Sequence, residues 1–304
     1  KEPFSHWPSL VIITVQLVMI TRDGQWLKGS LLTEAPTSKE VLNLTDSAYQ
    51  GTPIQPGEIK EEDAIVFPLL HGPNGEDGTI QGFLETIGMP YVGAGVLTSA
   101  CGMDKIMTKY ILQAAGIPQV PYVPVLKNYW KENPKKVFEQ CEGSLLYPMF
   151  IKPANMGSSV GITKAENREE LQNALQEAYR YDTRAIVEQG IEAREIEVAV
   201  LGNEDVRTTM PGEIVKDVAF YDYNSKYLDN KIEMQIPAQI PEETQAKAQE
   251  FAKKAYTMLG GSGLSRCDFF LTNKNELFLN ELNTMPGFTE FSMYPLLWDC
   301  LLYT

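Results

Sequence analysis

A carboxylate and a carboxamide lie two positions apart in the stretch ELFLNELNTMPGF, residues 276–288, at the end of a predicted strand. Because side chains alternate between the faces of a strand, Glu281 and Asn283 are expected on one face. Leu277 and Leu279 are expected on the same face, nearer the core. Oxygen ligands at a strand end suit a hard cation such as Mg²⁺, although a strand that leaves the core for solvent would show the same pattern.

A second strand, LSRCDFF at residues 264–270, favours the metal interpretation. Arg266 and Asp268 share one face of it, and the turn TNKN that follows predicts a hairpin with the first strand. Pairing would bring Asp268 near Glu281 and Asn283, and oxygens that converge in this way repel one another unless a cation lies among them. Mg²⁺ with the phosphates of a nucleotide is the usual solution. Arg266 could then hold an anionic substrate or stabilise charge in a transition state.

Phosphate binding is indicated by the small-residue loop PANMGSSVGI, residues 153–162, between two predicted strands. Its glycines and the hydroxyls of Ser158 and Ser159 could cover phosphates. The loop lacks the GxxxxGK[ST] spacing of a Walker loop, however, and a Gly-Ser-Ser loop alone is more often a plain turn. Lys152, in the preceding strand, favours the phosphate interpretation because its ammonium can neutralise phosphate charge. Lys105 could act in the same way from a helix, where a lysine is usually a solvated surface charge.

Two glutamates flank a short hinge in VEQGIEAREIEV, residues 187–198. Such a hinge can present backbone groups to the edge of an adenine ring. Glu188, which ends one strand, or Glu195, which begins the next, could accept from an amino group or a ribose hydroxyl. Glutamates at strand ends are mostly solvated, so this pattern is weak on its own.

The elements that must position these residues begin with alternating strands and helices. Apolar runs at residues 10–20, 64–72 and 89–95 predict strands, and a helix is expected over residues 77–88. This βαβ order predicts a parallel sheet.

Further helices are expected over residues 98–116 and directly after Asn167, where Asn167 and Glu170 form a predicted capping box. The proline-punctuated residues 117–136 are expected to connect two units.

Composition narrows the choice of function. The 304 residues are 43% hydrophobic and carry a net charge of −14, which leaves no basic surface for nucleic acid. The apolar run at residues 10–20 is too short to span a membrane, so no membrane partner is expected. Four scattered cysteines favour free thiols in a reducing cytoplasm. With two histidines in the chain, any metal should bind through oxygen.

Taken in order over residues 15–298, the motifs resemble those of the D-alanine–D-alanine ligase family, within the ATP-grasp superfamily. The motifs that carry this resemblance are HGPNGEDGTIQG, GMDKIMTK, KPANMGSSVGI, FYDYNSKY and LNELNTMPGF. The resemblance implies an α/β ATP-grasp fold with an N-terminal parallel-sheet domain. It further implies a substrate domain over residues 1–98, a central ATP-grasp subdomain over residues 99–187, and a C-terminal subdomain with the metal site over residues 188–304.

The resemblance also implies the reaction and the roles of single residues. Two D-alanines would be joined with ATP through an acyl phosphate, in the cytoplasm, to make a precursor of peptidoglycan. Two Mg²⁺ ions, which Mn²⁺ could replace, would be held by Asp268, Glu281 and Asn283. The residues implied to contact ATP are Lys105, Lys152, Ser159, Glu188, Glu195 and Lys226.

The resemblance also implies which residues contact the substrates. His71 and Arg266 would line the acyl phosphate, and Gly287 and Ser292 would line the second D-alanine. Ser158 and Tyr227 would fix the loop, over residues 220–231, that closes above them. A homodimer is also expected from the resemblance.

The two ends of the chain depart from the family pattern. Residues 1–14 lack the Gly-Gly loop and the glutamate with which the family opens, and the last residues stop before a final helix. We therefore expect the first strand, loop and helix to be missing or altered. The partner of the first D-alanine's ammonium stays unassigned, with Glu76 as a candidate.

Two rival interpretations remain open. One is another ATP-grasp ligase, such as a D-alanine–D-lactate ligase, and Tyr227 argues against it because depsipeptide-forming relatives tend to lack this tyrosine. The other is a catalytically impaired nucleotide-binding protein, which would bind ATP without D-alanine-dependent turnover.

Overall fold

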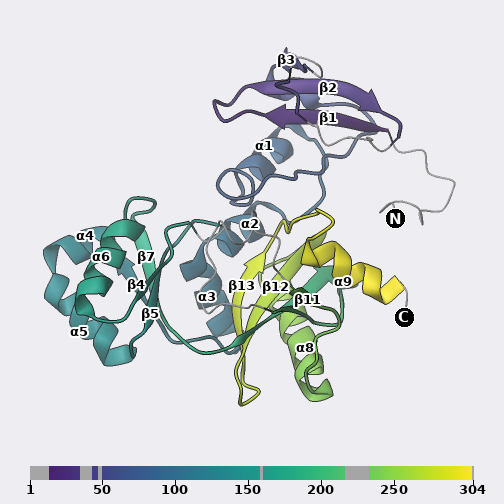
Figure 1. Ribbon diagram of the computed structural model, residues 1–304. Coiled ribbons are helices and arrows are strands. Elements are labelled where there is room, and N and C mark those ends of the chain that lie inside the picture. Colours follow the sequence, from purple (N-terminus) through teal and green to yellow (C-terminus); the bar gives the residue numbers. More distant parts are fainter. Residues whose placement is uncertain (1–13, 35–42, 47–49, 158–159, 216–232, 303–304) are drawn as a thin grey trace. The chain divides into compact units, whose positions relative to one another are not determined.

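The computed structural model describes residues 14–34, 43–46, 50–157, 160–215 and 233–302 (Figure 1). These residues fall into two units. The first lies within Lys1–Ala64 and Ile87–Met89, and the second within Ile65–Thr86 and Pro90–Thr304. Every predicted site residue among those described belongs to the second unit.

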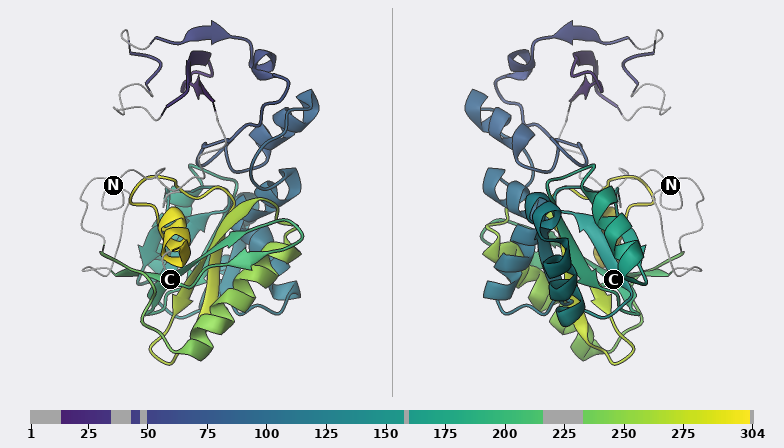
Figure 2. Two further views of the ribbon diagram at one scale, coloured as in Figure 1. Left: turned by 90° about the vertical axis from the view of Figure 1, so that its right-hand side faces the viewer. Right: turned by 90° about the vertical axis from the view of Figure 1, so that its left-hand side faces the viewer.

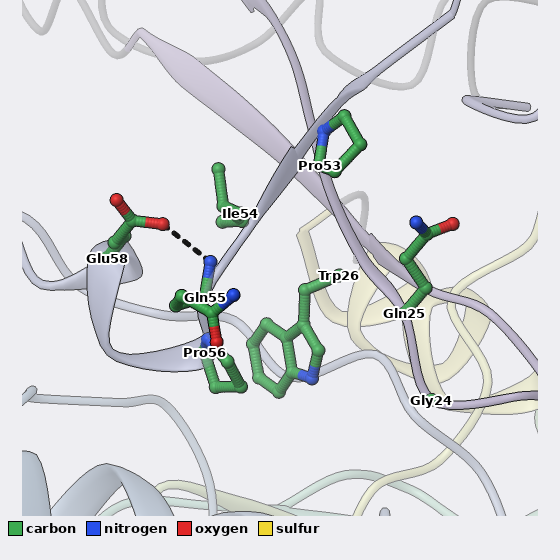
Figure 3. A pocket seen from close by; sticks show the side chains of 8 residues that line it. All are labelled: Gly24, Gln25, Trp26, Pro53, Ile54, Gln55, Pro56 and Glu58. Carbon is green, nitrogen blue, oxygen red and sulfur yellow. Dashed lines mark hydrogen bonds between the residues drawn. The ribbon is translucent and has the colours of Figure 1, made fainter.

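The first unit contains an antiparallel sheet in the order β1 (Val15–Ile20), β2 (Trp26–Leu32) and β3 (Thr52–Ile54). The predicted parallel sheet is therefore wrong for this part of the chain. A tight turn at Gly24, where φ is +84°, joins β1 directly to β2, and so short a connection can only join antiparallel strands. Figure 3 shows a hollow beside Trp26 in this unit, and none of the predicted site residues lines it.

The second unit begins with the predicted βαβ segment. The helix is confirmed as α1 (Thr79–Ile87), but the strands expected on either side of it are reduced to one parallel bridge between Val66 and Tyr91. Pro68 and Pro90 lack the N–H groups that longer ladders would need in this segment.

The helix predicted over residues 98–116 is two helices, α2 (Val96–Met103) and α3 (Lys105–Ala114). Asp104 separates them because its side chain accepts hydrogen bonds from the backbone N–H groups of Ile106 (3.0 Å) and Met107 (3.1 Å). This cap starts a new helix, so Lys105 occupies the first helical position.

A four-stranded antiparallel sheet follows, in the order β4 (Tyr122–Leu126), β7 (Arg184–Gln189), β5 (Met149–Pro153) and β6 (Thr163–Ala165). It shares a buried core with three helices: α4 (Lys127–Glu132), α5 (Pro134–Ser144) and α6 (Arg168–Ala178) (Figure 1).

Two predictions from the sequence concern this part of the chain. The connection expected over residues 117–136 is wrong, because those residues supply β4, α4 and the start of α5. The capping box before α6 is confirmed in part: Asn167 Oδ1 accepts from the Glu170 N–H at 3.0 Å, but the Glu170 carboxylate accepts from the Glu166 N–H (2.8 Å) instead of the Asn167 N–H.

The last sheet runs in the order β11 (Glu233–Gln235), β10 (Gly212–Val215), β8 (Arg194–Leu201), β12 (Leu264–Leu271) and β13 (Leu277–Asn283), and β9 (Arg207–Thr208) pairs with β8. Helix α8 (Glu242–Met258) packs with α3 on one face of this sheet (Figure 2). Helix α9 (Met293–Leu302) packs on β8 through a separate apolar cluster. Among the described residues, no helix is both long enough and apolar enough to cross a membrane.

Candidate active site

The predicted hairpin of β12 and β13 is confirmed, with Asp268 directly opposite Glu281. The register then shifts, because the next residue of β12, Phe269, lies opposite Leu279. Asn280 is therefore the extra residue of a β-bulge, and such a bulge re-aims the side chains that follow it.

The bulge changes the face on which the candidate ligands lie. Leu277, Leu279 and Leu282 are all buried in the core cluster under α8. Glu281 and Asn283 must therefore lie on the opposite face of the sheet. The expectation that they share a face with Leu277 and Leu279 is wrong, because alternation is reset at the bulge.

Three carboxylates form a row across neighbouring strands on this second face. Glu197 on β8 lies opposite Asp268 on β12, which lies opposite Glu281 on β13. Arg266 joins the row, with Nε 2.9 Å from Glu197 Oε2 and Nη2 2.6 Å from Asp268 Oδ2. Burial alone would lower the pKa of Arg266, but Asp268 and Glu197 raise it well above its ordinary value, so the guanidinium stays charged.

Two carboxylates of this row, together with the nearby amide of Asn283, form a set of ligands that fits Mg²⁺. Asp268, Glu281 and Asn283 offer two carboxylates and an amide, which are the oxygen ligands that this cation prefers. Within the described ranges, no three carboxylate, thiol or imidazole side chains form a metal site by themselves. An ion here would therefore need Asn283 and the oxygens of a nucleotide to complete its coordination.

Glu76 lies beside the row and is buried. Its carboxylate accepts from the Gly72 N–H at 2.6 Å. With the Asn283 amide oriented to satisfy both neighbours, Asn283 donates to Glu76 Oε1 (2.9 Å) and accepts from Arg266 Nη2 (3.3 Å). Burial raises the pKa of Glu76 to about 7, and the nearby charge of Glu281 adds to this effect.

The two lysines predicted to bind phosphate are both half-buried and lie near this face. Lys105 donates from Nζ to the carbonyl oxygen of Met156, within the small-residue loop. Lys152 on β5 has its Nζ 2.5 Å from Glu188 Oε2 and 3.5 Å from Asn280 Oδ1 on β13. Burial lowers the pKa of Lys105. For Lys152 the attraction of Glu188 outweighs burial and raises the pKa.

Glu188 lies between two ammonium groups. Besides Lys152, it pairs with Lys109 on α3, whose Nζ is 2.8 Å from Oε1. Burial on its own would raise the pKa of Glu188, but the two lysines lower it to about 2. Glu188 therefore lies among the phosphate-side lysines, and its contact with adenine or ribose stays a prediction. So does that of Glu195, which lies half-buried on β8 opposite Phe270.

The residues predicted to line the substrates meet at the loop after β13. Adding a Cβ atom to Gly287 would place it 2.7 Å from Ser292 Oγ, so these two residues are in close contact. Ser292 Oγ also accepts from the Thr289 N–H at 3.0 Å. His71 Nδ1 lies 3.1 Å from the carbonyl oxygen of Met285 in the same loop.

Four predicted site residues, Ser158, Ser159, Lys226 and Tyr227, lie outside the described residues. Two residues of the site were not predicted, namely Glu197 and Lys109. The strand period could have found Glu197, which lies two positions after Glu195, and the helix period could have found Lys109, one turn after Lys105.

The two antiparallel sheets, with Lys152 on one and a carboxylate row on the other, define an ATP-grasp ligase fold. Comparison with known proteins identifies the family. The family model "D-ala D-ala ligase N-terminus" matches residues 9–94, and "D-ala D-ala ligase C-terminus" matches residues 111–300. The chain belongs to the D-alanine–D-alanine ligase family.

Individual relatives agree with this assignment. A D-alanine–D-alanine ligase of Enterococcus gallinarum is 98% identical over 282 residues, which are 92% of this chain and 89% of that protein. One from Enterococcus hirae is 80% identical, covering 94% of this chain and 82% of that protein.

Solved structures give the same result for the fold. The VanG D-Ala:D-Ser ligase from Enterococcus faecalis superimposes with a TM-score of 0.79 at 36% identity, covering 93% of this chain and 84% of that one. The D-alanine–D-alanine ligase from Coxiella burnetii gives a TM-score of 0.75 at 33% identity, covering 95% of this chain and 80% of that one.

Proposed function

We propose that the chain joins two D-alanine molecules with ATP, making D-alanyl-D-alanine for peptidoglycan through an acyl-phosphate intermediate. Membership of the family supports the overall reaction. The observation that carries the mechanism is the arrangement of Asp268, Glu281 and Arg266 on the sheet face near the half-buried lysines Lys105 and Lys152.

The reaction needs an activated carboxyl group. A carboxylate is a poor electrophile, so an oxygen of the first D-alanine takes the γ-phosphoryl group of ATP, and ADP leaves. The amine of the second D-alanine then attacks the acyl carbon and loses a proton. Phosphate departs with the carboxylate oxygen that had attacked phosphorus. Positioning and electrostatic stabilisation supply most of the catalysis in such transfers.

The residues on the nucleotide side neutralise and orient the phosphates. Lys105 and Lys152 bring positive charge from a helix start and a neighbouring strand. Mg²⁺ held by Asp268, Glu281 and Asn283 would neutralise the phosphate charge that develops during transfer. The remaining proposed ATP contacts are Ser159, Glu188, Glu195 and Lys226.

Arg266 is the proposed stabiliser of the reacting acyl group. Its two carboxylate neighbours hold the guanidinium in a fixed orientation, so little reorganisation is needed when an oxyanion forms. His71 would line the acyl phosphate from the loop before α1. Gly287 and Ser292 would contact the second D-alanine.

Two proposed roles concern the closing loop and the first substrate. Ser158 and Tyr227 would hold that loop shut, so that water cannot hydrolyse the acyl phosphate. Glu76 is our candidate for the partner of the first D-alanine's ammonium, because it is a buried carboxylate within hydrogen-bond distance of Asn283.

The acceptor is tested by competition. Purified protein with ATP and Mg²⁺ is given D-alanine alone, or D-alanine with D-lactate or D-serine, and ADP and the ligated product are measured. D-Serine is included because a structure 36% identical is named a D-Ala:D-Ser ligase. We expect D-alanyl-D-alanine as the main product in every mixture. A depsipeptide or a D-serine product in excess would contradict the proposed acceptor, and ATP binding without turnover would contradict catalysis.

We make three further proposals, which concern the location, the oligomeric state and the domain boundaries of the protein. We propose a cytoplasmic location, supported by the free thiols of Cys101, Cys141 and Cys267. We also propose a homodimer, and the domain boundaries after residues 98 and 187. Sedimentation of the purified protein would test the dimer.

A further inference from the structure

Lys109 is a buried lysine to which the proposed reaction gives no role. It lies on α3 one turn after Lys105, and its side chain is 1% exposed. Its ammonium lies 2.8 Å from Glu188 Oε1 and 5.1 Å from the centre of the Tyr122 ring. Burying an ammonium is unfavourable unless it is paired, so its placement requires a compensating interaction.

Glu188 supplies that interaction and links Lys109 to the nucleotide side of the site. One carboxylate oxygen faces Lys109, and the other lies 2.5 Å from the ammonium of Lys152. β5 and β7 are adjacent strands, so Lys152 and Glu188 extend from neighbouring parts of one sheet. Lys152 also reaches Asn280, next to the proposed metal ligand Glu281.

The charges of Lys109, Glu188 and Lys152 do not cancel. Glu188 alone would neutralise Lys152 and leave little attraction for phosphate. With Lys109 present, one negative charge is shared by two positive charges, so the cluster retains one net positive charge. Such a charge in a buried site is weakly screened and attracts an anion strongly.

We propose that Lys109 is a positioning residue for the phosphates of ATP: it holds Glu188 so that Glu188 orients Lys152 without cancelling its charge. This inference rests on the proposed contact between Lys152 and phosphate. Lys109 does not itself touch the nucleotide in this proposal.

The first test replaces Lys109 by methionine in the full chain. Lys109→Met should raise the KM for ATP by about tenfold or more and leave the KM for D-alanine within about twofold, because only the phosphate-binding charge is lost. Lys109→Arg, which keeps the charge, should restore most of the affinity for ATP. An unchanged KM for ATP in Lys109→Met would overturn the proposal.

Lys127 provides the matched control. It is a partly buried lysine at the start of α4, and its Nζ donates to the carbonyl oxygen of Tyr179 at 2.7 Å. Lys127→Met should leave both KM values within about twofold of the wild type. A rise in the KM for ATP as large as that of Lys109→Met would mean that loss of any buried lysine is enough, and it would overturn the proposal.

A double-mutant cycle tests whether Lys109 acts by holding Glu188 or has only a structural role. Once Glu188 is neutral, Lys109 has no carboxylate to hold. Lys109→Met in a Glu188→Gln background should therefore change the KM for ATP by less than about threefold. Additive effects in the cycle would overturn the proposal.

Lys152→Met separates failure of this inference from failure of the proposed function. If Lys152→Met leaves the KM for ATP unchanged, the phosphate contact is wrong and the role of Lys109 falls with it. If Lys152→Met raises the KM and Lys109→Met does not, only the role of Lys109 is wrong. Thermal unfolding monitors the fold throughout. Should Lys109→Met not fold, Lys109→Gln, which keeps a donor for Glu188 but no charge, is measured against the same expectation.

Discussion

The carboxylate row gives the most direct residue-level prediction. Asp268→Ala or Glu281→Ala should lower kcat by more than about 100-fold, because each removes a proposed Mg²⁺ ligand. Neither side chain lies in the apolar core, so far-UV circular dichroism should be unchanged. Asp205→Ala is the control, since this carboxylate is exposed and pairs only with the exposed side chain of Arg207 among the described ion pairs. Retained activity in both Asp268→Ala and Glu281→Ala would remove the metal assignment.

The lowered pKa of Glu188 predicts that the free energy of unfolding depends on pH. The folded pKa of about 2 is below the ordinary value of 4.5, so the unfolded chain binds a proton first as the pH falls. The stability that Glu188 contributes is therefore complete above pH 4.5 and is lost between there and about pH 2.

The measurement compares wild type with Glu188→Gln by denaturant unfolding from pH 7 to pH 3. Wild type should be the more stable protein at pH 7, and its advantage should shrink below about pH 4.5. Glu192→Gln, at an exposed glutamate four residues along, should show no such change. A wild-type advantage that is constant over this pH range would contradict the ion pairs with Lys109 and Lys152.

At the scale of elements, the cap that begins α3 should position Lys105. Asp104→Ala should lower the free energy of unfolding by about 1 kcal/mol through loss of the cap and further through loss of the ion pair with Arg184, and it should also raise the KM for ATP several-fold. Asn167→Ala removes the equivalent cap of α6 and should lower the free energy of unfolding by about 1 kcal/mol. If Asn167→Ala raises the KM for ATP as much as Asp104→Ala does, the cap of α3 has no special role in positioning Lys105.

Sequence reasoning found the hairpin but not its bulge. Alternation along a strand places Glu281 in line with Leu279, whereas the bulge at Asn280 turns it to the other face. The spacing of the three leucines was the available indication, because Leu279 and Leu282 are three positions apart and both are buried.

Two other differences between the predicted and the observed structure have local causes. The apolar pattern continues from α2 into α3, so periodicity alone cannot detect the break that the Asp104 side chain makes. The antiparallel first sheet follows from one tight turn at Gly24, which apolar runs do not reveal. The motifs depend on residue types and their order and not on backbone geometry, so they could indicate candidate site residues despite these differences, and the roles of those residues stay predictions.

At the scale of the whole molecule, nucleotide binding should be confined to the second unit. Every proposed ATP and metal contact lies after residue 100, whereas β1, β2 and β3 lie in the first unit. A non-hydrolysable ATP analogue with Mg²⁺ should slow hydrogen exchange in β5, β7, β12 and β13 and leave exchange in β1 and β2 unchanged. Protection confined to β1 and β2 would place the nucleotide in the wrong unit for this account.

The most direct test of the central claim follows an oxygen atom. D-alanine labelled with oxygen-18 in its carboxylate is incubated with ATP, Mg²⁺ and the protein, and both products are analysed by mass spectrometry. Ligation through an acyl phosphate predicts D-alanyl-D-alanine together with one oxygen-18 atom in each phosphate released, because the attacking carboxylate oxygen leaves with phosphorus. Unlabelled phosphate accompanying the dipeptide, or phosphate release with no dipeptide, would contradict the account.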